Sequence, residues 1–338
     1  MVGIDIGTKT IKIVELENNG ASHTLTASGV VAINSVNSVD KLADDKEFAA
    51  VGQIVKKLHS EAGVSSKDVV ISIPESLCFT RAIKFPLLTD AEIASAVKWE
   101  SEQYIPIPVN EAIIQHTILE RRENSTPPEV VVLLVAAPRV IVEKYVKVIQ
   151  AAGLNPVAVE TELVALTRAL APTDRTILLV DLGASSTDIA IAKHGLLSFS
   201  RSIPIAGEAF TRALSQGLGV NAQQAEEYKK TYGLTSKELE GKVKGALGPI
   251  LNMVVDEIKK AIHYYQSEEK GESPSAVIIS GGTSGMPELI SMLTSLLGIE
   301  VLVGNPFGKV QLDPETAKKL SSYAPLYSVA VGLALREE

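Results

Sequence analysis

Two stretches of the chain, half a chain apart, show the same alternation of apolar and polar residues. Each stretch has three apolar runs, an Asp-x-Gly sequence at the end of the first run, and a tight turn after the second. The turns contain Gly20 and Gly195, and glycine favours tight hairpins. The runs lie at 2–6, 10–16 and 24–33 in the first stretch, and at 179–182, 188–193 and 196–205 in the second. Each stretch predicts a three-stranded meander, and the duplication predicts two homologous lobes that face one another.

The residues between the two stretches predict a separate α+β unit inserted into the first lobe. A helix near 47–61 and a strand at 69–73 come first, and Pro74 ends that strand. The inserted unit contains a capping box, Thr89-Asp90-Ala91-Glu92, which marks the start of a helix. Its expected elements are a strand at 78–85, a helix from 89 that ends before 106, strands at 112–119 and 130–137, and a helix from 140 that ends before 153.

Helical periodicity dominates the later part of the second lobe. Asn221 is a favourable helix cap, and an apolar stripe through Leu251, Val255 and Ile258 predicts a long helix. The expected elements are helices at 221–232, 247–266, 287–297 and 326–335 and a strand at 276–280. We predict a first lobe at 1–73, to which 154–172 and 322–338 return, an inserted unit at 74–153, and a second lobe at 173–321 with a helical part at about 206–272.

Composition narrows the classes of protein to consider. The formal net charge of −8 opposes general nucleic-acid binding, which needs a basic field. The single cysteine, Cys78, cannot form an internal disulfide, and we expect it to pack inertly in a reducing cytoplasm. The longest apolar run, near 130–137, is too short to span a bilayer. The chain opens directly into a strand and turn, so we expect no signal peptide.

The two Asp-x-Gly turns have the chemistry of a phosphate and magnesium site. Glycine lets the backbone approach a ligand, and successive exposed amides form a concavity that binds anions. The carboxylates of Asp5 and Asp181 suit magnesium, held through its retained waters. Lys12 shares the strand parity of Thr8 and Thr10, so its ammonium is expected near the phosphates. The alternative is that both are plain hairpin turns. The candidate ligands in the two loops are Gly7, Thr8, Lys9, Thr10, Gly183, Ala184, Ser185, Ser186 and Thr187.

Two further segments are candidates for the rest of such a site. Gly281-Gly282-Thr283 follows a buried strand and precedes a helix, so a flat ligand can lie against exposed backbone. The alternative is a simple strand-to-helix connection. Glu226 and Lys229 share a helix face at i, i+3, and spacing alone favours a solvated ion pair. The sequence has no nucleophile triad, metal-spaced histidines, Walker loop or dinucleotide fingerprint.

Taken in order, these segments resemble the actin, Hsp70 and sugar-kinase superfamily over nearly the whole chain. The resemblance implies a two-lobed α/β fold with a duplicated sheet that binds ATP and magnesium between the lobes. It identifies residues 5–10 and 181–188 with two phosphate loops and Gly281, Gly282 and Thr283 with the adenosine motif. It also identifies Glu226 and Lys229 with a pair that contacts adenosine, and Met286 with a side chain near the adenine.

The position of the inserted unit after the strand at 69–73 resembles the FtsA-like and PilM-like members of that superfamily. Of these two families, the chain more closely resembles the PilM-like family of type IV pilus assembly. The resemblance lies in residues 3–7, 85–108 and 152–160. FtsA-like proteins end in an amphipathic membrane helix, for which no counterpart is expected after residue 335.

Membership of the PilM-like family would imply a cytoplasmic protein at the inner face of the inner membrane. Such proteins bind the N-terminal cytoplasmic peptide of PilN between the first lobe and the inserted unit, which connects them to the PilN–PilO–PilP complex and twitching motility. Self-association is a further expectation. Trp99 lies off the apolar face of its helix, so it is either an exposed partner anchor or packs on the neighbouring lobe.

Three functions remain open from the sequence. The first is a nucleotide-dependent scaffold with at most slow hydrolysis, and the second is an FtsA-like filament protein of cell division. The third is a small-molecule kinase, which needs a base for the acceptor hydroxyl. Glu160 and Glu162, at the crossover between the lobes, are the catalytic candidates, and Asp188 is another possible base.

Overall fold

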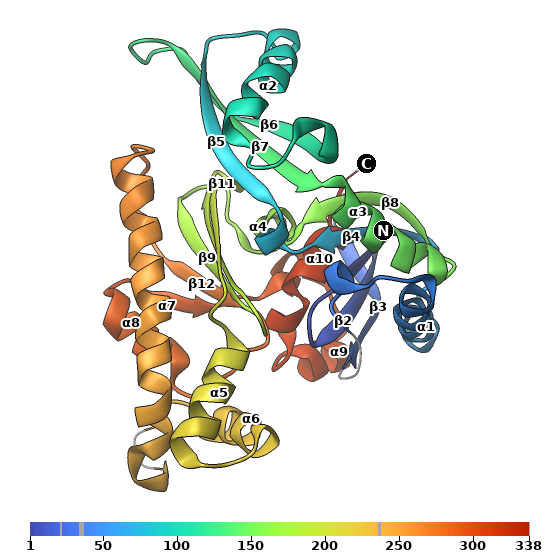
Figure 1. Cartoon of the computed structure of the whole chain (residues 1–338), viewed down its shortest axis with the longest axis vertical. Helices are drawn as coiled ribbons and strands as arrows, with labels where there is room; N and C mark the ends of the chain where they lie inside the picture. The colour runs from blue at the N-terminus through green and yellow to red at the C-terminus, as the bar shows by residue number, and fades with distance from the viewer. Residues whose placement is uncertain (21, 34–36, 236–237, 338) are drawn as a thin grey trace.

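Two sheets with the same strand order form the centres of two lobes (Figure 1). The computed structural model describes residues 1–20, 22–33, 37–235 and 238–337. The first sheet has the order β14-β3-β2-β1-β4-β8, and the second has the order β11-β10-β9-β12-β13. The first comprises β1 (Val2–Ile6), β2 (Thr10–Asn18), β3 (His23–Ala32), β4 (Asp68–Ile73), β8 (Asn155–Thr161) and β14 (Val310–Gln311). The second comprises β9 (Ile177–Leu182), β10 (Thr187–Lys193), β11 (Leu196–Ile203), β12 (Val277–Ser280) and β13 (Val301–Val303).

Five strands of the first sheet, β3-β2-β1-β4-β8, correspond in order to the five strands of the second, and β14 is an addition at the edge of the first. In each, a three-stranded antiparallel meander is followed by two strands that run parallel to its first strand. The first strand of each meander, β1 and β9, is a nearly continuous run of buried residues, as expected for a strand covered on both faces. The duplication read from the sequence is confirmed, and with it the two-lobed actin-like fold.

Helices cover the outer faces of both sheets. In the first lobe, α1 (Asp45–Glu61) packs against α3 (Arg139–Ala151). In the second, α7 (Lys242–Ser267) runs the length of the lobe, and α5 (Gly207–Leu218) and α6 (Ala222–Thr231) lie at its far end (Figure 1). The remaining helix of this lobe is α8 (Leu289–Leu297). Short 3₁₀ turns are η1 (Val39–Lys41), η2 (Glu75–Leu77), η3 (Val109–Glu111), η4 (Glu238–Gly241), η5 (Pro306–Lys309) and η6 (Ala324–Tyr327).

Two helices form the junction between the lobes. They are α4 (Glu162–Leu170) and α10 (Ser328–Ala334), and α9 (Pro314–Leu320) precedes the second of them. A Cβ added at Gly332 would lie 1.9 Å from the carbonyl oxygen of Ala165, so only glycine permits this crossing. A Cβ at Gly3 would lie 2.2 Å from the carbonyl oxygen of Ala330. These two glycines let α10 press against both α4 and β1.

The inserted unit is a three-stranded sheet with one helix. Its strands are β5 (Phe79–Pro86), β6 (Ala112–Arg122) and β7 (Glu129–Pro138), in the order β5-β7-β6, and its helix is α2 (Asp90–Tyr104). The expected capping box is present, since Thr89 and Glu92 exchange hydrogen bonds. The unit lies at the opposite end of the molecule from α5 and α6 (Figure 1). Trp99 on α2 is 77% exposed, which favours the first of the two expectations for it.

The structure differs from the expected extent of the inserted unit, 74–153, at its last helix. The buried residues Tyr145, Val148 and Ile149 of α3 belong to the core of the first lobe, beside Val55 of α1. An amphipathic helix looks the same in sequence whichever lobe receives its apolar face. Cys78 also packs against this core, and burial raises the pKa of its thiol.

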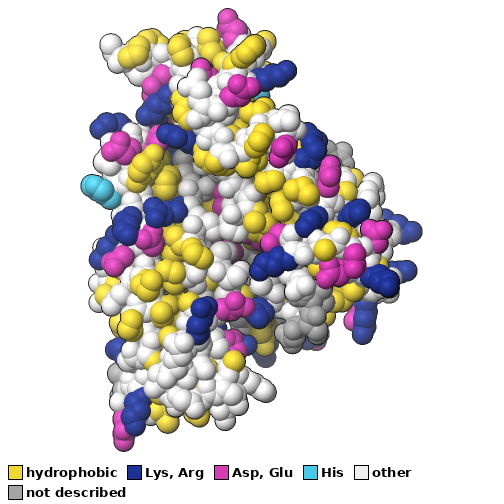
Figure 2. Space-filling model, in the orientation of Figure 1, with side chains coloured by type: hydrophobic (Ala, Val, Ile, Leu, Met, Phe, Trp, Pro, Cys, Tyr) yellow, Lys and Arg dark blue, Asp and Glu magenta, His cyan; other side chains and the backbone are white. Residues whose placement is uncertain are grey.

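The surface carries both signs of charge. On the face shown in Figure 2, basic and acidic side chains are interspersed, so this face has no large field of one sign. In the described part of the chain, no helix has the length and apolar character needed to cross a membrane.

Candidate nucleotide-binding site

The two Asp-x-Gly turns have the same backbone geometry. In the first loop, the Gly7 amide donates to the Thr10 carbonyl at 3.0 Å. In the second, the Gly183 amide donates to the Ser186 carbonyl at the same distance. The strand pairing closes just before each loop, at Ile6 with Ile11 and at Leu182 with Thr187. The duplicated sequence therefore builds two loops of the same length with the same closing hydrogen bond, one in each lobe.

These loops face each other across a cavity of about 1410 Å³ between the lobes. The hydroxyl oxygens of Thr8 and Ser185 are 2.9 Å apart, although the residues are 177 positions apart in sequence. Lys9 Nζ lies 2.9 Å from the carboxylate of Glu208 at the start of α5. The cavity exceeds the usual 300–1,000 Å³ of small-ligand sites, so a nucleotide fits within it.

Glycines keep the walls of the cavity clear. Gly281 has a φ of +86°, and a Cβ there would lie 2.6 Å from Asp181 Oδ1. A Cβ at Gly207 would lie 2.8 Å from Thr283 Oγ1. A side chain at either position would fill the cradle next to the Asp181 loop, so the backbone itself forms the wall.

A group of four carboxylates and one ammonium forms the floor. Lys12 Nζ lies 2.8 Å from Asp5 Oδ2, and both side chains are almost fully buried. Asp181 on β9 occupies the position that Asp5 occupies on β1. The residue opposite Asp5 on the next strand is Lys12, whereas the residue opposite Asp181 is Asp188. Glu162, the first residue of α4, also lines the cavity. The second lobe thus contributes two acids where the first contributes an ion pair.

Burial and mutual repulsion shift the pKa values of these groups. Burial raises the pKa of Asp181 to about 6, and the Asp5 carboxylate adds to this effect while Lys12 opposes it. Burial likewise raises the pKa of Asp188 to about 7, and raises that of Glu162 well above its ordinary value. Burial would lower the pKa of Lys12, but the carboxylates, Asp5 first, hold it above its ordinary value. The floor is short of positive charge, which suits a cation.

The carboxylates of the floor suit a hydrated magnesium ion better than a metal that is ligated directly by side chains. Carboxylate oxygens are the ligands Mg²⁺ prefers, and Asp188 Oδ1 is buried without a hydrogen-bond partner. Within residues 1–20, 22–33, 37–235 and 238–337, no three His, Cys, Asp or Glu side chains are arranged to hold a metal. A cation here would keep several of its waters.

The expected adenosine-side residues are brought to the same cavity. Lys229 Nζ contacts Glu226 Oε2 at 2.6 Å, Thr211 Oγ1 at 3.0 Å and the Gly207 carbonyl at 3.1 Å. Burial opposes ionisation of Glu226, but Lys229 and Thr211 hold its pKa below the ordinary value. The pair is therefore an ordered part of the wall, which spacing alone did not indicate.

The Gly281–Met286 loop completes that wall. Thr283 Oγ1 donates to the Gly183 carbonyl at 3.1 Å, which ties this loop to the second Asp-x-Gly turn. Met286 is buried and lines the cavity.

Two of the predicted site residues lie away from the cavity. Glu160 is buried outside it, where its carboxylate pairs with Arg168 at 2.8 Å and with Arg336. Its role is therefore structural, and the expectation that it is catalytic is corrected. Thr187 turns its hydroxyl to the Ile205 carbonyl at 2.6 Å and does not line the cavity. The other candidates all line it: Asp5, Gly7, Thr8, Lys9, Thr10, Lys12, Glu162, Asp181, Gly183, Ala184, Ser185, Ser186, Glu226, Lys229, Gly281, Gly282, Thr283 and Met286.

Sequence reasoning missed two serines that support the aspartates. Ser72 Oγ donates to Asp5 Oδ1 at 3.3 Å, and Ser280 is the cross-strand neighbour of Asp181 on the matching parallel strand. Both serines end an apolar run that continues the repeat, Val70-Ile71-Ser72 and Ile278-Ile279-Ser280. Extending the comparison of the two stretches to their fourth strands would have found them. Thr211, on α5, was missed because nothing local to it signals a site.

The model of the family described as "Type IV pilus assembly protein PilM" matches residues 3–338. A solved "PilM-PilN type IV pilus biogenesis complex" superposes with a TM-score of 0.84 and 28% identity over 99% of this chain and 97% of that one.

More distant relatives agree in fold. MreB 5 of Spiroplasma citri bound to AMPPNP has a TM-score of 0.55 at 13% identity and covers 98% of this chain and 93% of its own. The cell division protein FtsA of Bacillus subtilis is 23% identical over 90% of this chain and 78% of its own length. Because a family model matches nearly the whole sequence, the chain belongs to the family of the type IV pilus assembly protein PilM.

Proposed function

We propose that this chain is a cytoplasmic, ATP-binding component of type IV pilus assembly that binds the N-terminal cytoplasmic peptide of PilN. The observation that carries the nucleotide part is the pair of loops with matching closing hydrogen bonds, which meet across the cavity with Thr8 and Ser185 in contact. Two glycine-turn loops that carry hydroxyls and line one cavity suit a chain of phosphates. A plain pair of structural hairpins would not need a cavity of this size between them.

Each wall of the cavity has a proposed role. The loops at 7–10 and 183–186 hold the phosphates, and Lys12 supplies the positive charge among the carboxylates. Asp5 and Asp181 hold Mg²⁺ through its waters, because the ion prefers oxygen ligands and retains part of its hydration shell. Glu226, Lys229 and the Gly281–Met286 loop bind the adenosine. Magnesium bound there neutralises the phosphate charge.

We expect at most slow hydrolysis of ATP. Glu162 is the catalytic candidate that lines the cavity, and its raised pKa suits a group that accepts or orients a proton. Its Oε2 accepts a hydrogen bond from the Glu75 amide at 3.3 Å, at the start of the inserted unit. This contact connects the floor of the cavity to that unit.

PilN is proposed as the partner because the superposed solved structure is a complex of PilM with PilN. The groove between the first lobe and the inserted unit is the proposed peptide site. Through PilN the protein would join the PilN–PilO–PilP complex at the inner face of the inner membrane and contribute to twitching motility. ATP that bridges the lobes would bias their closure about α4 and α10 and thereby change the affinity of the groove.

The nucleotide site is tested by calorimetric titration of MgATP into wild type and Asp181→Ala. We expect submillimolar or tighter binding in wild type and loss of detectable binding in the variant. Asp174→Ala is the matched control because Asp174 is exposed and far from the cavity. Wild-type protein that binds no MgATP would contradict the nucleotide assignment.

The partner is tested separately, with a synthetic peptide of the PilN N-terminus. Its affinity is measured with wild type in the presence and absence of MgATP, and again with Asp181→Ala. Binding in all three cases at one affinity would support the partner and refute the coupling. Absence of binding in every case would refute PilN as the partner and leave the nucleotide result untouched.

A further inference from the structure

A buried carboxyl group lies where the chain leaves the first lobe and enters the inserted unit. Glu75 begins η2 directly after Pro74, and the residue is only 4% exposed. Its neighbours Ser76 and Leu77 line the nucleotide cavity, whereas Glu75 is covered by protein. A buried carboxyl group is costly unless it is paired with a cation or is neutral, so its surroundings decide its state.

The groups around this carboxyl come from all three units of the molecule. Thr80 lies on β5 of the inserted unit, and Ser200 lies on β11 of the second lobe. Thr161 ends β8 of the first lobe and caps α4. β11 packs against η2, β5 and α4, which brings these side chains together. We refer to Glu75 and the three hydroxyl residues as the Glu75 junction.

The hydrogen bonding of the junction favours a neutral carboxyl group. Glu75 Oε2 and Thr80 Oγ1 are both buried without a hydrogen-bond partner in the part of the chain that the structure describes. A carboxylate can only accept hydrogen bonds, whereas a protonated carboxyl group has an O–H that can donate to a hydroxyl oxygen. Burial accordingly raises the pKa of Glu75, although the hydroxyls of Ser200, Thr80 and Thr161 oppose part of that shift.

The titratable groups nearest Glu75 are acids. Glu162 Oε2 accepts a hydrogen bond from the Glu75 amide at 3.3 Å. Burial raises the pKa of Asp188 and that of Cys78, and negative charge on Glu75 adds to both shifts, which places both groups close to it. Ionisation of Glu75 would therefore add a charge among like charges in a buried site.

Two arginines of the adjoining strands are held by other partners. Arg81 Cζ of β5 lies 5.0 Å from the ring centre of Tyr104, and Arg201 of β11 pairs with Glu257 of α7. Both guanidinium groups are thus engaged away from Glu75, so a proton is the simplest way to neutralise it.

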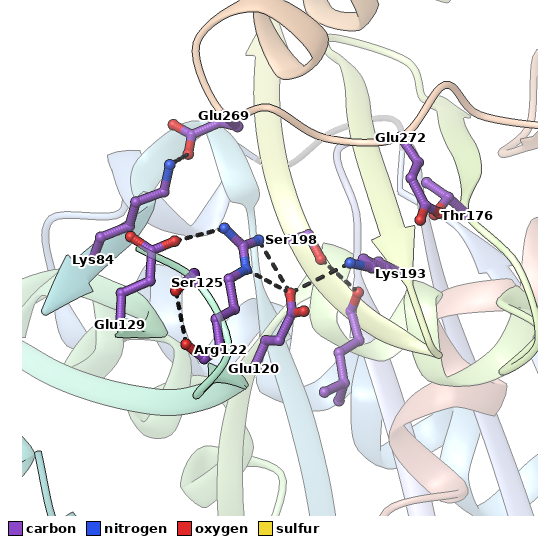
Figure 3. A network of polar contacts seen from close by, with 11 residues as sticks. Lys84, Glu120, Arg122, Ser125, Glu129, Thr176, Lys193, Ser198, Glu269 and Glu272 are labelled. Atoms are coloured by element: carbon purple, nitrogen blue, oxygen red, sulfur yellow. Dashed lines mark hydrogen bonds and ion pairs between the residues drawn. The ribbon is translucent and has the colours of Figure 1, made fainter. Parts of the chain in front are cut away.

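Ion pairs nearer the surface also join the inserted unit to the second lobe (Figure 3). Lys84 of β5 pairs with Glu269, beyond the end of α7, at 3.8 Å. Lys193 of β10 pairs with Glu120 of β6 at 3.3 Å. These side chains are partly exposed, and ion pairs of this kind contribute little to stability because water and salt screen them. The buried Glu75 junction is therefore expected to decide how firmly the two units are held together.

We propose that the Glu75 junction, closed when Glu75 is neutral, fixes the inserted unit against both lobes and carries changes in the nucleotide cavity to that unit. Loss of the proton would remove the donor and add a charge beside Glu162 and Asp188, so β5 and η2 would separate from β11. Glu162 lines the cavity and holds the Glu75 amide, so a ligand that moves Glu162 also moves η2. The link to the cavity rests on the proposed nucleotide function, whereas the junction itself does not.

The junction is tested in the nucleotide-free protein by hydrogen exchange at pH 6 and pH 9, corrected for the intrinsic exchange rate. Because the pKa of Glu75 is raised on folding, the stabilising effect of the junction is complete below the pKa of a free carboxyl and is lost as the pH rises through the raised value. We expect exchange at 79–86 and 196–203 to be about tenfold faster at pH 9 in wild type, and to change less than about twofold in Glu75→Gln. Glu111→Gln, at an exposed position in η3, is the matched control and should behave like wild type.

Two further variants open the junction without a change of pH. Glu75→Leu removes the carboxyl group, and Ser200→Ala removes a single hydroxyl and serves if the leucine variant does not fold. Either variant should speed exchange at 79–86 and 196–203 at pH 6 by about threefold or more. An equal response to pH in wild type and Glu75→Gln, or unchanged exchange in Ser200→Ala, would overturn the proposal.

The link to the cavity is tested by adding MgATP to wild type and to Ser200→Ala at pH 6. Exchange should slow at the loops 7–10 and 183–186 in both proteins, and the change at 79–86 should be less than half as large in the variant. Slower exchange at the loops with no change at 79–86 in wild type would overturn the link and leave the nucleotide site standing. No change at either place would overturn the nucleotide assignment and the link with it, while the pH response still decides the junction.

Discussion

Replacing Asp188 with asparagine should stabilise the nucleotide-free protein at alkaline pH. Asp188 and Ser202 are directly opposed in the β10–β11 ladder, where the buried Ser202 hydroxyl falls outside hydrogen-bond geometry yet lowers the pKa of Asp188. An asparagine amide at this position can donate to Ser202 Oγ, whereas a carboxylate brings a second negative charge next to Asp181. The substitution removes the charge, and this removal is the source of the expected gain.

The size of the effect follows from the pKa. Burial raises the pKa of Asp188 from the ordinary 3.8 to about 7 in the folded protein. Asp188 therefore makes its full contribution to the free energy of unfolding below about pH 4, and that contribution is lost as the pH rises to 7. About three pH units correspond to roughly 4 kcal/mol as an upper bound. Because neighbouring carboxylates share the protons, we expect about half of that, or about 2 kcal/mol.

The gain in stability is measured by thermal unfolding of the wild type and of Asp188→Asn at pH 8 and at pH 5. For a chain of this length, a gain of about 2 kcal/mol raises the melting temperature by roughly 3 °C at pH 8, and the gain should be less than half as large at pH 5. Asp174→Asn, at an exposed position, controls for the general effect of removing a carboxylate. A melting temperature at or below wild type at pH 8, or an equal gain at both pH values, would refute the reasoning.

Four other substitutions test the packing and the floor of the cavity. Gly332→Val should lower the free energy of unfolding by more than about 3 kcal/mol, because its Cβ would overlap the backbone of α4. Gly248→Ala should raise the free energy of unfolding by about 0.5–1 kcal/mol, because the space around this position in α7 is open. Thermal unfolding measures both. Glu160→Gln should lower the free energy of unfolding by about 2 kcal/mol and leave MgATP affinity within twofold, as measured by calorimetry. Lys12→Met should weaken MgATP binding at least tenfold, since it removes the one ammonium among the buried carboxylates; unchanged affinity would contradict the role given to it.

Features that depend on a few neighbouring residues could be predicted from the sequence. The Asp-x-Gly turns, the meanders that flank them and the capping box at Thr89 are specified by local backbone preferences and by alternation, and the structure contains all of them. Duplication added a constraint between distant segments, because two copies of one meander imply two similar lobes. The general position of the candidate site followed from that constraint alone.

Contacts between segments far apart in the chain decided the rest. Glu160 and Glu162 are two positions apart, yet β8 directs the first toward Arg168 and Arg336 while α4 directs the second into the cavity. The last helix of the expected inserted unit joined the first lobe because α1 offered it an apolar face. Alternation and periodicity determine which face of an element is apolar. Only the assembled structure determines which neighbour covers that face, since the free energy of burial does not depend on where in the sequence the covering residues lie.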